Sequence, residues 1–307
     1  MEEQHSQNYF SLMEAFFSGP ENASEELNSR LLKRADLLVI KGYDQYHTSQ
    51  FEAAFESWQT SLKIYRELAI PQAEGVCLTN MGLACEGRGD YRQAIDYYQQ
   101  ALTIARAIGD RKGEGEILVN LGSLYCDLGQ YERALTYYQQ SLEIGEELQQ
   151  ELLLASALGN LGNIYQIVGD YEQAKKHLEK SLELAKHGKN ILEQSYVLGN
   201  LGWLNYSLGE YDKAIEQYQQ SLAIKQQRGD LRGEVHTLGR LGLVYDERGN
   251  HNQAIDYHQQ GLAISREIGY RLGEIDTFKI LVLLSSSMET WNKQKKASMM
   301  LLLLGNP

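Results

Sequence analysis

The chain has 307 residues, 43% of them hydrophobic and 23% charged, with a formal net charge of −12. This composition is typical of a soluble folded protein, and an acidic chain without a dense Lys/Arg block is not expected to bind nucleic acid or an anionic membrane. Three cysteines are too few for a disulfide framework and the N-terminus lacks the pattern of a secretion signal, so we expect a cytoplasmic protein.

Residues 1–30 are expected to form an N-terminal capping or regulatory segment. Phe10, Met13 and Phe17 have the spacing of one face of a short amphipathic helix that ends near Pro20. In repeat proteins the terminal repeats commonly differ in sequence from the inner repeats, because one of their faces meets solvent or a cap. The first interpretation is therefore a cap, and the alternative is a segment that occupies a binding surface and regulates it.

From residue 31 to residue 271 the chain repeats itself every 40 residues. Residues 120–142 read NLGSLYCDLGQYERALTYYQQSL, and the stretch 40 positions later reads NLGNIYQIVGDYEQAKKHLEKSL. Six copies follow one another without insertion or deletion. Four slots keep one residue type in all six copies, and in the first copy they are Leu38, Gly42, Ala54 and Leu62. Such a period predicts a solenoid in which each copy packs on its neighbours.

Each copy contains two apolar runs at helical spacing. In the third copy Gly129 separates them, as expected where a helix ends in a left-handed residue. Between copies, Gly109 followed by Asp110 predicts a helix end and the N-cap of the next helix. Gly122 and Ala134 are expected on facing helices of one hairpin, where only small side chains permit close approach, and Tyr125 and Tyr138 are expected to fill the space beside them. Each copy is therefore predicted to be a helical hairpin, and the architecture all-α.

The pattern LxxLGxxYxxxGxYxxAxxYYxxSL resembles the tetratricopeptide repeat (TPR), over roughly residues 35–290. The resemblance implies a right-handed α-solenoid (superhelix) of six TPR helical hairpins with N- and C-terminal capping helices. The chain departs from the usual repeat in two ways. The usual repeat has about 34 residues and a Pro that closes its second helix, whereas here the period is 40 residues and no repeat has that Pro. The longer period is similar to that of Pins-like adaptors and of large bacterial TPR proteins, which in cyanobacteria often precede a caspase-like protease domain.

After Glu274 the repeat pattern decays. Phe278, Leu281 and Leu284 still predict a seventh helix of the first type, but the sequence that follows is not repeat sequence. We expect residues 272–307 to form a C-terminal capping helix and an irregular tail. The alternative is a remnant of a longer protein whose downstream domain is missing.

Residues with catalytic potential occupy structural slots. Cys85 and His258 stand where other copies have Tyr, which favours packing roles, and the chain contains no CxxC, HExxH or phosphate-binding loop. We therefore expect no enzyme, no cofactor and no metal.

The resemblance implies that the first helix of each hairpin lines a concave groove. The residue before Leu-Gly recurs as Asn80, Asn120, Asn160 and Asn200 and then becomes Arg240. An amide carries donors and an acceptor, so a ladder of asparagines can pair with the backbone of an extended peptide. The alternative is that each Asn bonds a carbonyl of a neighbouring helix and fixes the stacking of the hairpins.

Slots beside the asparagines vary from copy to copy, as in a specificity surface. Asn163 and Trp203 lie one turn further along, and Tyr206 lies one turn beyond Trp203. Large aromatic side chains are typical of interaction hot spots, although both could instead pack between hairpins.

Acidic residues are expected on the inner edge of the groove, and those that we assign to the partner surface are Glu86, Asp127 and Asp246. Complementary charge then predicts a protein or peptide partner with a neutral or basic segment. The leading hypothesis is a protein–protein interaction scaffold. The alternative is a sensor or recognition module of a signalling or caspase-like protease system whose effector domain is absent or acts in trans. The sequence leaves the oligomeric state open.

Overall fold

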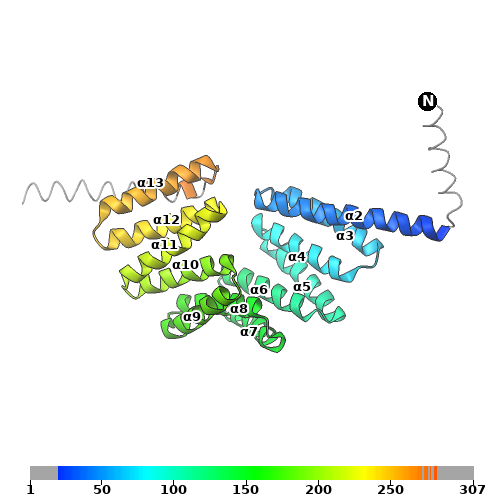
Figure 1. Cartoon of the computed structure of the whole chain (residues 1–307), viewed down its shortest axis with the longest axis horizontal. Coiled ribbons are helices and arrows are strands. Elements are labelled where there is room, and N and C mark those ends of the chain that lie inside the picture. The colour runs from blue at the N-terminus through cyan, green and yellow to red at the C-terminus, as the bar shows by residue number, and fades with distance from the viewer. Residues whose placement is uncertain (1–19, 272, 276, 278–279, 282–307) are drawn as a thin grey trace, which may run out of the picture. The chain divides into compact units, whose positions relative to one another are not determined.

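The computed structural model describes residues 20–271, 273–275, 277 and 280–281, and there it is helical without any strand (Figure 1). None of the described helices combines the length and the apolar character needed to span a membrane. The helices are α2 (Pro20–His47), α3 (Phe51–Glu67), α4 (Pro71–Gly87), α5 (Tyr91–Ile108), α6 (Arg111–Asp127), α7 (Tyr131–Leu148), α8 (Glu151–Ile167), α9 (Tyr171–His187), α10 (Ile191–Ser207), α11 (Tyr211–Arg228), α12 (Leu231–Glu247) and α13 (His251–Glu267).

These helices form two compact units, Met1–Leu148 and Gln149–Pro307. Within the first unit the hairpins are α2/α3, α4/α5 and α6/α7, and within the second they are α8/α9, α10/α11 and α12/α13. In the second unit the first helices also contact one another, α8 with α10 and α10 with α12. The fold is therefore an α-solenoid built from six consecutive helical hairpins, as the repeat predicts.

The helix boundaries follow from the predicted caps. The carboxylate of Asp110 accepts a hydrogen bond from the backbone N of Gly113 at 2.9 Å and so caps α6. Gly109, which ends α5, has a φ of 71°, and Gly129 between α6 and α7 has a φ of 70°. L side chains rarely adopt this left-handed conformation, which explains glycine there. The expected caps and breaks are confirmed.

Each hairpin is closed by a glycine of the first helix against a large side chain of the second. A Cβ placed on Gly122 would lie 2.5 Å from Cε1 of Tyr138, closer than real Cβ atoms approach. The ring of Tyr138 therefore packs directly on Gly122, whereas the sequence placed Tyr138 only beside a contact between Gly122 and Ala134, and the same arrangement recurs in all six hairpins. The pairs are Gly42–Trp58, Gly82–Tyr98, Gly122–Tyr138, Gly162–Leu178, Gly202–Tyr218 and Gly242–His258.

At both ends the structure covers only part of what the sequence predicts. Helix α2 begins at Pro20 and continues through residue 30, so that its first turns extend the first hairpin. The amphipathic pattern at Phe10, Met13 and Phe17 lies outside the described residues. Beyond α13, the described residues 271, 273–275, 277 and 280–281 are helical, at the place of the predicted seventh first helix, whereas residues 282–307 lie outside the described part.

Candidate functional site

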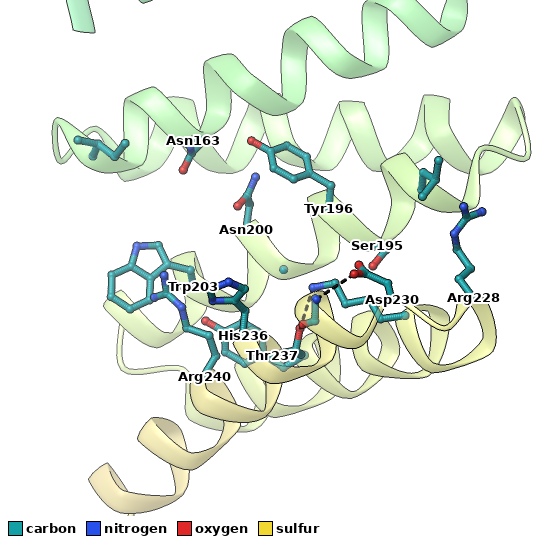
Figure 2. Close-up of a pocket in the computed structure, with 16 residues that line it drawn as sticks. Asn163, Ser195, Tyr196, Asn200, Trp203, Arg228, Asp230, His236, Thr237 and Arg240 are labelled. Carbon is teal, nitrogen blue, oxygen red and sulfur yellow. Dashed lines mark hydrogen bonds between the residues drawn. The ribbon is translucent and has the colours of Figure 1, made fainter. Parts of the chain in front are cut away.

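Each unit has a pocket between the first helices of two adjacent hairpins. The second-unit pocket, a cavity of about 540 Å³, is formed by α10 and α12, the second helix α11 and the C-terminal half of α8 (Figure 2). The first-unit pocket, of about 320 Å³, is formed by α4 and α6 with α5 between them and Tyr43 of α2. The predicted candidates Asn163, Asn200, Trp203 and Arg240 line the second-unit pocket, and Asn80 and Asn120 line the first-unit pocket.

The asparagines of the predicted ladder differ in their partners. Asn80 Nδ2 lies 3.0 Å from the hydroxyl of Tyr43, on the preceding first helix. Asn160 donates to the carbonyl of Ser156 at 2.9 Å and accepts from the hydroxyl of Tyr196 at 2.9 Å. Asn200 Nδ2, by contrast, is buried without a hydrogen-bond partner. Asn80 and Asn160 therefore help to join neighbouring first helices, whereas Asn200 keeps a donor for another group.

The aromatic residues of the fifth repeat are held in place from three sides. The rings of Trp203 and Tyr206 are stacked, with centroids 5.3 Å apart. The indole N–H of Trp203 lies 2.6 Å from the side-chain oxygen of Gln166 when that amide is oriented to accept. The guanidinium of Arg240 lies over the Trp203 ring, 4.0 Å from its centroid (Figure 2). Such a cation–π contact orients the guanidinium at the edge of the pocket.

Cationic side chains predominate in the second-unit pocket. Lys225, Arg228 and Arg240 line it together with a single carboxylate, Asp230. Lys225 Nζ donates to Thr237 Oγ1 at 2.7 Å. Burial lowers the pKa of Lys225, and the Asp230 carboxylate opposes that shift.

His236 also lines this pocket and lies beside its cations. Burial lowers the pKa of His236, and the positive charges of Lys225 and Arg240 lower it further. Its imidazole is therefore neutral at pH 7, so the positive charge of the pocket comes from Lys225, Arg228 and Arg240.

Tyr218 adds a second polar group that lacks a partner. Its ring closes the α10/α11 hairpin and is 2% exposed, and its hydroxyl is buried without a hydrogen-bond partner. The equivalent hydroxyls of Tyr98 and Tyr138 donate to Glu86 at 3.0 Å and to Ser123 at 3.1 Å. Burial raises the pKa of Tyr218, although the nearby Arg240 guanidinium acts on the hydroxyl in the opposite direction, so the hydroxyl keeps its proton. Since a guanidinium cannot accept a hydrogen bond, the O–H can still donate into the pocket that Tyr218 lines.

The predicted acidic candidates lie outside both pockets. Glu86 accepts the Tyr98 hydrogen bond; its burial raises its pKa to about 7, an effect to which Asp127 adds. Asp246 lies 2.7 Å from His251 Nδ1 and forms an ion pair when the imidazole is protonated. Asn160 and Tyr206 also do not line the second-unit pocket, although each contacts a residue that does.

The sequence-predicted site did not include Lys225 and Arg228, because they lie on the second helix α11 and the candidates were taken from the first helices. Thr237 lies on the first helix α12, but outside the slots that were singled out. The signal that could have found them is the comparison of copies. The slot of Lys225 holds Tyr65, Ala105, Gly145, Ala185 and Ser265 in the other copies, and that of Arg228 holds Leu68, Ile108, Leu148, Gly188 and Ile268.

The reactive side chains Cys85 and His258 are buried, and Cys126 is half-buried. Burial raises the pKa of the Cys85 and Cys126 thiols, which disfavours the nucleophilic thiolate. His258 is 1% exposed in the slot of Tyr138. Among the described residues, no group of three or more His, Cys, Asp or Glu side chains is placed to hold a metal ion.

Comparisons with known proteins bear on the family and the fold. No curated protein matches the chain. Among solved structures it is similar to BtubC (BKLC) from P. vanneervenii, with 25% identity, a TM-score of 0.59 and coverage of 71% of this chain and 92% of that one.

Two peptide or factor complexes of Rap proteins are also similar in fold. A Rap protein complexed with Competence and Sporulation Factor has 15% identity and a TM-score of 0.61, covering 87% of this chain and 80% of that one. The Rap conjugation gene regulator of the plasmid pLS20, in complex with the Phr* peptide, has 19% identity and a TM-score of 0.64, covering 78% of this chain and 64% of that one. At these identities the likeness shows the fold alone.

Two family models described as tetratricopeptide repeat match the chain. One matches residues 34–107, 113–187 and 153–227, more than half of the chain, and the other matches residues 235–268. The chain therefore belongs to the tetratricopeptide repeat family.

Proposed function

We propose that this protein is an interaction scaffold that binds a peptide segment of a partner along the first helices of its hairpins. The observation that carries the proposal is the second-unit pocket. Asn200 Nδ2 and the Tyr218 hydroxyl are buried there without partners. Buried polar groups are nearly always hydrogen-bonded in folded proteins, so two orphaned groups at one pocket indicate a ligand that supplies the missing partners.

The fold supports this proposal. The two Rap complexes described above contain a bound peptide or factor, so a similar fold accommodates such ligands in those proteins. The volume of about 540 Å³ lies in the range of pockets that hold small ligands or a few side chains. We therefore assign a binding role rather than a catalytic one to this surface.

The proposed charge preference differs between the units. In the first-unit pocket Asp110 and Glu116 face a single cation, Lys112, and the neutral or basic segment expected from the sequence fits that pocket. The second-unit pocket has the opposite balance, with three cations and one carboxylate. We therefore restrict the expected preference for neutral or basic segments to the first unit.

A displayed library of random peptides, selected against the full chain, tests the proposal. We expect enriched peptides whose binding is weakened by Asn200→Ala. The matched control is Asn160→Ala, because Asn160 is already bonded within the protein and does not line the pocket. Absence of any enriched peptide, or equal effects of both variants on affinity while both remain folded, would contradict the proposed site.

A further inference from the structure

We infer that the second-unit pocket is a subsite for an acidic side chain, an Asp or Glu of the bound peptide. This inference rests on the proposed function and names the ligand chemistry of one pocket. It contrasts with the net charge of −12 of the whole chain and with the acidic lining of the first-unit pocket.

The array itself shows which residues make the second-unit pocket different. Three copies earlier, the same slots surround the first-unit pocket, so the two can be compared residue by residue. At five slots the first-unit pocket has an apolar, amide or acidic side chain, and the second-unit pocket has a polar or cationic one instead. The replacements are Ala105 by Lys225, Ile108 by Arg228, Glu116 by His236, Ile117 by Thr237 and Asn120 by Arg240.

The three cations are not neutralised within the described part of the protein. No carboxylate of the described residues forms an ion pair with Lys225, Arg228 or Arg240. The nearest acid in the lining, Asp230, accepts from the backbone N of Gly233 at 2.9 Å and so caps α12. Asp230 also attracts Lys225, but one carboxylate is outnumbered by three cations in the lining, so the pocket keeps an excess of positive charge that can attract an anion from outside.

The uncharged groups of the pocket also favour an acceptor. Asn200 Nδ2 can only donate, and the protonated Tyr218 hydroxyl can donate as well. The Arg240 guanidinium, oriented on Trp203, offers a planar fork of donors. Figure 2 shows Asn200, Trp203, His236 and Arg240 grouped around one part of the pocket. A carboxylate, which accepts several hydrogen bonds and carries negative charge, is complementary to this set.

Apolar side chains in the lining favour a peptide side chain over a bare anion. Ile167 and Leu192 line the same pocket and are 45% and 57% exposed. A ligand that fills the cavity therefore places apolar atoms beside its charged group, as an acidic residue with apolar neighbours does.

Capped peptides with a single variable position test the inference. A peptide taken from the selection above is prepared with Glu, Gln or Lys at each position in turn, with both termini blocked, and its affinity for the full chain is measured by fluorescence anisotropy. At one position, Glu is expected to bind about ten-fold more tightly than Gln, and Lys more weakly than Gln, since charge-assisted hydrogen bonds are worth more than neutral ones. The ratio should fall as salt rises.

Substitutions that introduce the residues of the first-unit pocket test whether the preference for Glu over Gln comes from the second-unit pocket. Lys225→Ala, Arg228→Ile and Arg240→Asn place at each slot the residue that the fold already carries three copies earlier. Together they should reduce the Glu-to-Gln ratio to about one while the Gln peptide still binds. The control is Arg232→Asn on the same helix α12, which removes one positive charge outside the pocket.

Each outcome has a distinct meaning. Equal affinities for Glu and Gln at every position, or loss of the ratio in the Arg232→Asn control, would overturn the subsite while leaving the peptide scaffold intact. A peptide that prefers a free terminal carboxylate to an internal Glu would overturn the assignment to a side chain. If no peptide binds at all, the proposed function fails and the subsite fails with it.

Discussion

Two glycines of α10 measure how tightly each hairpin is packed. A Cβ on Gly202 would lie 2.7 Å from Cε1 and 2.8 Å from Cδ1 of Tyr218. A Cβ on Gly199, one turn earlier, would meet Ser221 Oγ at 3.8 Å, an ordinary contact. Both glycines lie inside the same helix, so replacement by Ala brings each the same intrinsic gain of about 1 kcal/mol in helix propensity.

The two Gly→Ala variants should therefore differ in sign. Gly199→Ala is expected to raise the free energy of unfolding by about 0.5–1 kcal/mol. Gly202→Ala is expected to lower it by about 2 kcal/mol, because overpacking against a buried ring costs about 3 kcal/mol and the helix gain offsets only part of it. Urea unfolding followed by circular dichroism gives both values. Equal stability of the two variants would refute the packing argument.

Three further predictions concern polar groups. Asn160→Ala should lower the free energy of unfolding by about 0.5–1 kcal/mol, because it removes the hydrogen bond from Tyr196. Asn200→Ala should leave the free energy of unfolding unchanged or raise it, since the buried Nδ2 has no partner to lose, and equal losses in urea melts would contradict this. Burial raises the pKa of Glu193 from 4.5 to about 7, so the folded state should lose stability as pH rises through that window. Glu193→Gln should therefore stabilise the protein by about 1–3 kcal/mol at pH 8 and change its stability little at pH 4. A variant whose stability has the same pH dependence as that of the parent would show the reasoning to be wrong. Burial lowers the pKa of His258 below 6.5, so the unfolded state binds a proton more readily and stability should fall as pH drops below that value. His258→Tyr introduces the residue that most equivalent slots carry and should reduce this acid sensitivity. Identical acid unfolding transitions of the variant and the parent would count against this prediction.

The sequence by itself determined the hairpins, their order and their closure. Helical periodicity, the glycine at most helix ends and the capping Asp of several helices are local features, so their consequences can be predicted without knowledge of distant contacts. Six copies in register also predicted that Gly122 lies where the two helices of a hairpin approach closely, but only the tertiary structure decided that the Tyr138 ring packs directly on it. The asparagine positions on the first helices followed from the same regularity, although their function did not.

Only the tertiary structure decided which polar groups are already satisfied. Asn160 and Asn200 occupy one slot and are indistinguishable in the repeat pattern, but the partner of Asn160 is Tyr196, 36 residues away. In the slot of Tyr196 the next copy has His236, whose ring lies near Tyr270 instead. The difference between a structural Asn and one that keeps a free donor therefore depends on the neighbouring repeat, which a single slot does not reveal.

Packing likewise decided which charged side chains come together in the second-unit pocket. Lys225 lies on α11, and it lines the pocket together with Arg240 of α12 because the second helix lies between two first helices. Residues on different helices form one electrostatic environment only when the hairpins are stacked. Since charge acts through space rather than along the chain, net charge and groove slots predicted an acidic surface, and three-dimensional packing produced a cationic pocket within it.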